Sequence, residues 1–188
     1  MSKRFPNSKI WTRREIKPLL KQLSKHLCHF HTEYGGSWRR KSKTLNDIDI
    51  IIRTTRSYER WLIRKILIDA GYGTVPSGRT YMDVFYIDIK GFRIPIDVFY
   101  CDERNYGSVK LFTTGSKYHN DFLREKLAEL DMNWDNVQCF TCNKTGLRVS
   151  FKTEDKALSF LGLGPNKPCQ RNKGDIMYDI NYNPVREL

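Results

Sequence analysis

The sequence lacks several features that would assign the protein to a broad class. It has no apolar run of the roughly 18 residues that a membrane-spanning helix needs, and its basic N-terminal residues lack the apolar core and cleavage site of a secretory signal. Its five cysteines are odd in number and irregularly spaced, which is typical of reduced thiols rather than of a disulfide framework. These absences predict an intracellular protein without a membrane partner, and we expect a monomer.

Charge is unevenly distributed along the 188 residues. The net charge is +12, and residues 1–45 hold twelve lysines and arginines against two acids, Glu15 and Glu33. The remaining 143 residues therefore carry a balance of only +2. A concentrated basic segment predicts binding to a polyanion, although charge alone does not separate DNA from RNA or from a phosphorylated small molecule.

Hydrophobic periodicity predicts an amphipathic helix over residues 13–30, which a capping box of Thr12 and Glu15 would start. Pro18 would then lie inside this helix, so its regular part alternatively begins near Lys17. Cations four residues apart follow one flank of this helix: Arg13, Lys17, Lys21 and Lys25. This flank is the expected DNA-binding surface.

The rest of the chain alternates between strand and helix patterns. We expect strands over residues 47–53, 80–89 and 92–101, the last two joined by a Lys90-Gly91 turn. Further strands are expected over 137–142 and 147–151, and helices over 60–70, 116–130 and 154–161. The order predicts an α+β fold with a mixed or antiparallel sheet covered by helices, followed by a smaller lobe.

Three aspartates stand where strand side chains would otherwise be apolar. Asp47 and Asp49 flank Ile48, and residues i and i+2 of a strand point to the same face. Asp97 lies among apolar residues of a later strand, where an isolated carboxylate is costly unless it meets a cation or strong donors. Three carboxylates on adjacent strands would suit a pair of Mg²⁺ or Mn²⁺ ions.

A glycine-serine step precedes these aspartates. Gly36 and Ser37 are separated from Asp47 by nine residues, which begin with Trp38, Arg39 and Arg40. Glycine allows the backbone to approach a phosphate closely, and a serine hydroxyl with arginines supplies the donors that a triphosphate requires. The combination of these motifs is typical of the polymerase-beta-like nucleotidyltransferase superfamily.

Within that superfamily, the chain resembles the family X DNA polymerases over residues 13 to 165. Residues 36–40 resemble the GSxRR phosphate-binding element, and the three aspartates match the metal ligands of the family. Residues 109–116 resemble the thumb segment that ends in YFTGS. The resemblance implies that nucleotide contacts come from Gly36, Ser37, Arg39, Arg40, Phe112, Thr113, Gly115, Asn120 and Arg124.

The resemblance also implies a domain organisation. Residues 1–106 would form a palm with the basic N-terminal helix, and residues 107–188 a small α/β thumb, as in the smallest viral members. Lys41 departs from the family pattern because it replaces a usual glycine after the arginine pair. Residues 112–114 do not reproduce the aromatic pair of the YFTGS segment, which leaves the choice between dNTP and rNTP open.

The implied activity is that of a DNA-directed DNA polymerase. It would add dNTPs to the 3′-OH of a primer by a two-metal mechanism, filling short gaps during DNA repair such as base excision repair. Its partners would be gapped or primer–template DNA and a dNTP. One alternative is a template-independent nucleotidyltransferase acting on nucleic acid or protein. Another is an inactive basic module that binds nucleic acid.

Overall fold

The computed structural model describes residues 9–54 and 56–188, so that residues 1–8 of the basic segment lie outside the described residues. By proximity of its residues the chain divides into two compact units. The described residues up to Trp38, together with Ser42–Cys101, form the first unit. The second comprises Arg39–Lys41 and Asp102–Leu188. The arginine pair that follows the glycine-serine step is therefore part of the second unit.

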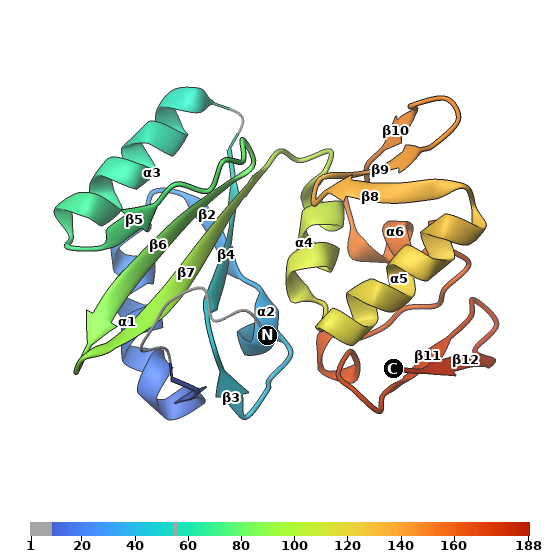
Figure 1. The fold of residues 1–188 in the computed structure, drawn as a ribbon, viewed down its shortest axis with the longest axis horizontal. Coiled ribbons are helices and arrows are strands. Elements are labelled where there is room, and N and C mark those ends of the chain that lie inside the picture. Colours follow the sequence, from blue (N-terminus) through green and yellow to red (C-terminus); the bar gives the residue numbers. More distant parts are fainter. Residues whose placement is uncertain (1–8, 55) are drawn as a thin grey trace. The chain divides into compact units, whose positions relative to one another are not determined.

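A five-stranded mixed sheet forms the centre of the first unit, with the strand order β2-β4-β7-β6-β5 (Figure 1). The pairing of β4 with β7 is parallel, and the other pairings in this sheet are antiparallel. A short ladder joins β1 to β3. The elements of this part of the chain are α1 (Arg13–His26), α2 (Gly36–Arg39), α3 (Ser57–Asp69), β1 (Trp11–Thr12), β2 (His31–Tyr34), β3 (Thr44–Leu45), β4 (Ile48–Arg53), β5 (Gly73–Val75), β6 (Met82–Ile89) and β7 (Phe92–Cys101).

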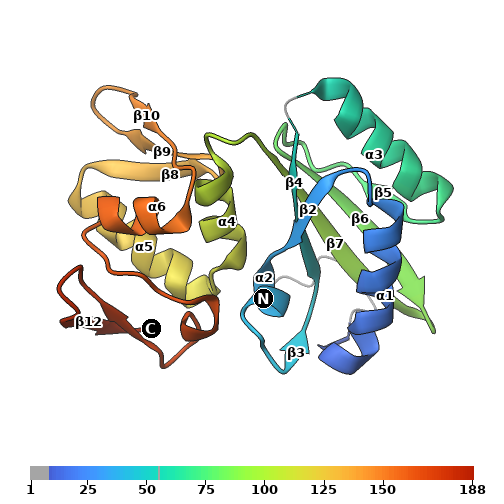
Figure 2. The ribbon, with the colours of Figure 1, turned by 180° about the vertical axis from the view of Figure 1, so that it is seen from behind.

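The core of the first unit lies between one face of this sheet and the helices α1 and α3 (Figures 1 and 2). Alternate residues of β4 and β7 point into this core, because successive side chains of a strand point to opposite faces. The core residues from these four elements are Ile16, Leu19, Leu20, Leu23, Ile48, Ile50, Ile52, Ile63, Leu67, Ile94, Ile96, Val98 and Tyr100. Asp49 and Asp97 occupy the intervening positions and so lie on the opposite face.

Helix α1 begins where the sequence places its start. The hydroxyl of Thr12 accepts a hydrogen bond from the backbone of Glu15, whose carboxylate accepts one from the backbone N–H of Thr12 at 2.8 Å. This capping box satisfies two backbone donors and stabilises a helix by about 1 kcal/mol. The helix therefore starts at Arg13 and contains Pro18, and it ends at His26 rather than at residue 30.

The second unit packs helices against a three-stranded antiparallel sheet with the order β10-β9-β8. Its aromatic cluster includes Trp134, whose ring meets the edges of Phe112 and Phe140 at centroid distances of 5.2 and 5.1 Å. A terminal hairpin pairs β11 with β12. The elements are α4 (Tyr106–Thr114), α5 (Lys117–Glu129), β8 (Met132–Asn136), β9 (Cys139–Cys142), β10 (Arg148–Val149), α6 (Glu154–Phe160), the 3₁₀ turn η1 (Pro168–Gln170), β11 (Ile176–Tyr178) and β12 (Pro184–Glu187).

These elements confirm the predicted α+β class and a mixed central sheet flanked by helices. Strand β7 has the predicted bounds, whereas β4 begins at Ile48, one residue after Asp47. The five cysteines, all within the described residues, are free thiols. Among the described helices, none is both long and apolar enough to span a bilayer.

A buried aspartate on β6 joins the sheet to α3. The carboxylate of Asp83 accepts hydrogen bonds from Arg60 at 2.9 and 3.1 Å, from Arg64 at 2.8 Å and from the hydroxyl of Tyr100 at 2.8 Å. Burial alone would raise the pKa of Asp83, but the hydrogen bonds from Arg60 and Tyr100 and the charges of the two arginines outweigh burial and lower it. Asp83 is therefore a charged structural group, and the cations that pair with it belong to α3.

We predict that Asp83→Asn lowers the free energy of unfolding by about 3 kcal/mol at pH 7, because it removes the charge that the two arginines neutralise. The folded pKa of Asp83 lies below its ordinary value of 3.8. Its contribution is thus complete above pH 3.8 and is lost as the pH falls through the folded pKa. Urea denaturation at several pH values measures the difference between wild type and variant, which should shrink toward acid.

The matched control is Asp88→Asn on the same strand. Asp88 is exposed and pairs with Arg93 at 3.0 Å, and exposed pairs contribute at most about 1 kcal/mol. Equal losses for the two variants, or a loss for Asp83→Asn that is independent of pH, would contradict the assignment.

Candidate functional site

Asp49 and Asp97 lie directly opposite each other in the parallel pairing of β4 with β7. Neighbouring strands are about 4.8 Å apart, and paired residues of parallel strands point to the same face. The neighbours of Asp49, Ile48 and Ile50, are buried in the core, which turns Asp49 to the other face of the sheet. Asp97 is 9% exposed. The fold therefore brings two of the three predicted carboxylates together.

Asp47 lies in a bend before β4 and is partly exposed. We expected it to share a strand face with Asp49 through the two-residue period, but β4 begins only at Ile48. Its position near Asp49 thus depends on the bend rather than on the strand. Asp47, Asp49 and Asp97 all make polar or electrostatic contacts in the structure.

The glycine loop packs against the carboxylate of Asp49. The backbone N–H of Gly35 donates to the carbonyl oxygen of Asp49 at 2.9 Å. Gly36 has a φ of +53°, and a Cβ atom at this position would lie 1.8 Å from Oδ2 of Asp49. Glycine is required here both for the left-handed backbone and for the close approach. The predicted phosphate loop therefore directly contacts one of the predicted metal ligands.

Ser37 and Trp38 continue this loop within α2. Trp38 packs against the core of the first unit, and the guanidinium group of Arg13 stacks on its ring at 3.8 Å from the centroid. Arg13 also donates to the carbonyl oxygen of Trp38 at 2.8 Å. Arg13, which we expected on the DNA-binding flank, thus fastens α1 to the residue that follows Ser37.

The structure permits a test of whether these residues suit a divalent cation. In the described ranges 9–54 and 56–188, no group of three or more His, Cys, Asp or Glu side chains is arranged to hold a metal ion. Mg²⁺, however, keeps several waters and usually takes one or two carboxylates together with substrate phosphates. The in-register pair of Asp49 and Asp97 meets that requirement, so the residues present fit Mg²⁺ when phosphates complete its coordination.

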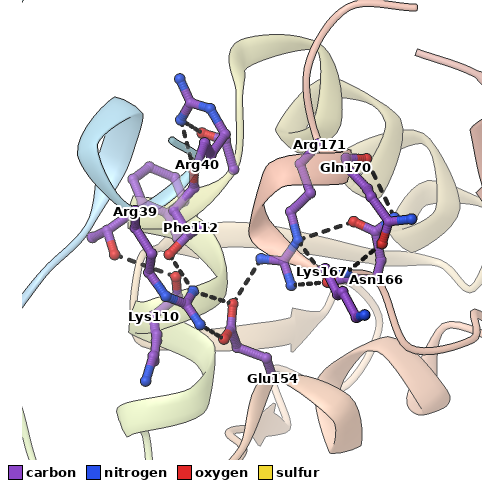
Figure 3. Close-up of polar contacts among 12 residues, drawn as sticks. Arg39, Arg40, Lys110, Phe112, Glu154, Asn166, Lys167, Gln170 and Arg171 are labelled. Carbon is purple, nitrogen blue, oxygen red and sulfur yellow. Dashed lines mark hydrogen bonds and ion pairs between the residues drawn. The ribbon is translucent and has the colours of Figure 1, made fainter. Parts of the chain in front are cut away.

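Arg39 belongs to a buried ion-pair cluster in the second unit (Figure 3). Its Nη1 donates at 2.8 Å to Glu154, which also accepts from Nη1 of Arg171 at 2.7 Å. Burial would raise the pKa of Glu154, but the hydrogen bond from Arg39 and the charges of both arginines lower it. Arg171 is 1% exposed and donates to Asn166 as well. Glu154 therefore pairs with two guanidinium groups within the second unit.

Arg40 contacts the segment between α4 and α5. Its Nη1 donates to the carbonyl oxygens of Thr114 and Gly115 at 2.6 and 2.8 Å, and Nε donates to Asn172 at 3.3 Å. Lys41, in the place of a family glycine, has a φ of +59°, a left-handed value that glycine adopts more easily. The arginine pair and Lys41 thus form a tight turn whose donors reach backbone oxygens of the thumb-like segment.

The remaining predicted nucleotide contacts lie on α4 and α5. Thr113 is buried and donates to the carbonyl oxygen of Val109 at 2.9 Å. Asn120 donates to the carbonyl oxygen of Phe112 at 2.9 Å. A Cβ atom at Gly115 would lie 2.2 Å from Oδ1 of Asn120, so glycine is needed there. Phe112, Thr113, Gly115 and Asn120 are thus gathered at the junction of the two helices, and their nucleotide contacts stay a prediction.

Arg124 lies one turn further along α5, and its side chain is exposed. It forms an ion pair with Asp121 at 2.9 Å. Its guanidinium carbon also lies 5.9 Å from the ring centroid of Phe112. The template contact that the resemblance implies for Arg124 stays a prediction.

Several groups near this junction could not be predicted from sequence patterns. Glu154 and Arg171 were not expected to pair, because they are 17 residues apart and Arg171 lies in a segment rich in proline and asparagine. His119 is fully buried, and burial lowers its pKa to about 3, so that it is neutral at pH 7. A neutral, buried imidazole at this place is suited to packing rather than to binding phosphate.

Comparisons with protein-family models and with curated proteins find no relative of the chain. No protein-family model matches the chain, and no curated protein matches it significantly. The resemblance to family X polymerases therefore stays a prediction from the sequence motifs.

We predict that Gly36→Ala destabilises the protein by about 3 kcal/mol, of which about 1 kcal/mol is backbone strain and the rest overlap with Asp49. Gly71→Ala is the matched control, since Gly71 has a φ of +88° but no atom within 4 Å of its Cβ position. Gly71→Ala should lower the free energy of unfolding by about 1 kcal/mol. Urea denaturation measures both, and equal losses would contradict a close contact of Gly36 with Asp49.

Proposed function

We propose that the chain is a nucleotidyltransferase of the family X DNA polymerase type, which adds dNTPs to the 3′-OH of a primer and fills short gaps in DNA. One observation carries this proposal. The glycine of the phosphate-binding motif packs against Asp49, and Asp49 lies in register with Asp97 on the next strand. Two motifs that are 60 residues apart in the sequence thus meet on one face of a sheet.

In this proposal Asp49 and Asp97, with Asp47 from the preceding bend, hold divalent cations. Mg²⁺ or Mn²⁺ bound there supplies Lewis-acid polarisation of phosphoryl oxygens and a lowered pKa for the primer hydroxyl. The two carboxylates would determine the position of the bound cations, because the hydrogen bonds between β4 and β7 hold their strands in register. Most of the rate enhancement would come from positioning and electrostatics, as in other phosphoryl transfers.

The glycine loop has a separate role. Because Gly36 has no side chain, the loop backbone lies against the carboxylate of Asp49, and we expect this backbone to bind the triphosphate there. The hydroxyl of Ser37, the next residue, is a donor of the kind that phosphate oxygens accept. Arg13 holds the loop in place, because its guanidinium group stacks on the ring of Trp38 and donates a hydrogen bond to the carbonyl oxygen of Trp38. We expect these contacts to affect the affinity for the nucleotide rather than the rate of the chemical step.

Arg39 and Arg40 make different contacts in the structure, and these contacts favour different roles. Arg39 already forms an ion pair with Glu154, which favours a structural role over a phosphate contact. Arg40 donates to the carbonyl oxygens of Thr114 and Gly115. We keep Arg40 as the proposed phosphate contact, because Arg39 is engaged in an ion pair with Glu154.

Primer extension tests the proposal. On a duplex with a one-nucleotide gap and with Mg²⁺, we expect incorporation of the complementary dNTP when the four are supplied separately. Asp97→Asn should lower the rate by about 10²-fold or more, because it removes a charge that holds the cation. The matched control is Asp88→Asn on the neighbouring strand, which should keep the wild-type rate.

The other outcomes are equally informative. Wild-type incorporation by Asp97→Asn would exclude this site. Extension of a single strand, or no preference among the four bases, would indicate a template-independent transferase. No extension by the wild type, with duplex binding retained, would indicate an inactive module that binds nucleic acid.

A further inference from the structure

Helix α1 has one apolar and one basic face. Its buried residues, among them Leu19 and Leu23, pack on the sheet, and the exposed surface faces away from it (Figure 2). The exposed cations of α1, here called the α1 basic face, are Arg14, Lys17, Lys21 and Lys25. Arg14 takes the place that we expected for Arg13, whose guanidinium group is engaged by Trp38.

The cations of the α1 basic face have no acidic partner among the described residues. The one acid of α1, Glu15, is held by Lys9 at 3.0 Å and by the capping box. Some exposed cations of other helices are paired on the same helix, as Lys65 is with Asp69 and Arg124 with Asp121. The four charges of α1 repel one another and are thus left for an external anion.

The spacing of these charges suits a nucleic-acid strand. Arg14 and Lys25 are 11 residues apart, which is about 16 Å along a helix axis. One strand of B-DNA carries about five phosphates over that length. The other exposed positions of α1 are Glu15, Pro18, Gln22 and Ser24. A helix that lies on a membrane needs large apolar side chains beside its cations, and this face has none.

This surface is separated from the aspartates by the sheet. Asp49 and Asp97 lie on the sheet face opposite α1, and the body of the helix, about 10 Å thick, lies between the sheet and the cations. We propose that the α1 basic face is a second DNA-binding surface, which holds duplex DNA by its phosphates at a segment distinct from any 3′ end at the aspartates. This surface does not depend on the proposed nucleotidyl transfer.

The test is the salt dependence of duplex binding. Fluorescence anisotropy with a labelled 30-base-pair duplex, in EDTA and without dNTP, gives the slope of log K against log[NaCl]. Each phosphate contact contributes about 0.9 to this slope. The quadruple variant replaces four residues by glutamine: Arg14→Gln, Lys17→Gln, Lys21→Gln and Lys25→Gln. The magnitude of its slope should be smaller than that of the wild type by 3 to 4 units. Glutamine keeps the helix propensity, and circular dichroism verifies the fold.

Two control variants separate local contacts from net charge. The first control replaces four lysines by glutamine, each taken from an ion pair outside α1, and removes the same number of positive charges: Lys65, Lys126, Lys144 and Lys152. It should lower the slope by less than one unit. Lys17→Arg, Lys21→Arg, Lys25→Arg keeps the charges of α1 and should keep the wild-type slope.

An unchanged slope for the α1 variant, or an equal loss in the control variant, would overturn the proposal. A loss seen only with single-stranded oligonucleotides or with phosphatidylserine vesicles would overturn it too, because the surface would then bind another polyanion. Asp97→Asn should keep the wild-type slope in this assay, so that failure of the proposed catalysis and failure of this surface give different results.

Discussion

The parallel pairing of β4 with β7 is the constraint on which the candidate site depends. A shift of one residue in this register would place Asp49 opposite an apolar residue of the core and would turn one row of isoleucines outward. Ile48, Ile50 and Ile52 pack against α1 and α3, and each buried side chain of this size contributes about 2 kcal/mol. The apolar core therefore fixes the register, and the register brings the two carboxylates together.

Two aspartates of the same sheet illustrate how burial and partners determine a role. Asp83 lies on the helix-covered face, and Arg60, Arg64 and Tyr100 satisfy it. Asp97 lies on the other face, beside Asp49. The same cost of burying a carboxylate applies to both. For Asp83 the neutralising cations belong to the protein, which makes it structural, and for the pair of Asp49 and Asp97 we propose a divalent cation.

Elements with a clear pattern were predictable from the sequence. The capping box of Thr12 and Glu15 marked one of the two starts considered for α1, and the alternation of Ile94, Ile96 and Val98 predicted β7 with its observed bounds. Helix α4 was not predicted, because it is buried on nearly all sides and lacks an amphipathic stripe. It also contains Gly107, where a Cβ atom would lie 2.3 Å from the backbone of Thr153, so a residue that disfavours helices is required by packing.

The candidate site was predictable in its residue types but not in its geometry. The glycine-serine step and the aspartates were visible as motifs, whereas the contact of Gly36 with Asp49 depends on the pairing of the sheet and on a left-handed backbone angle. The cluster of Arg39, Glu154 and Arg171 joins residues more than 100 positions apart, and nothing in their local sequence indicates this contact. Long-range ion pairs of this kind arise only from the tertiary fold.

We propose that Asp49 and Asp97 form the binding site for a divalent cation. An anomalous difference map from crystals soaked in Mn²⁺ and a dNTP, recorded at the manganese edge, measures this most directly. We predict a peak coordinated by the carboxylates of Asp49 and Asp97, and its loss in Asp97→Asn. Absence of a peak between these carboxylates, or Mn²⁺ bound only elsewhere on the chain, would contradict it.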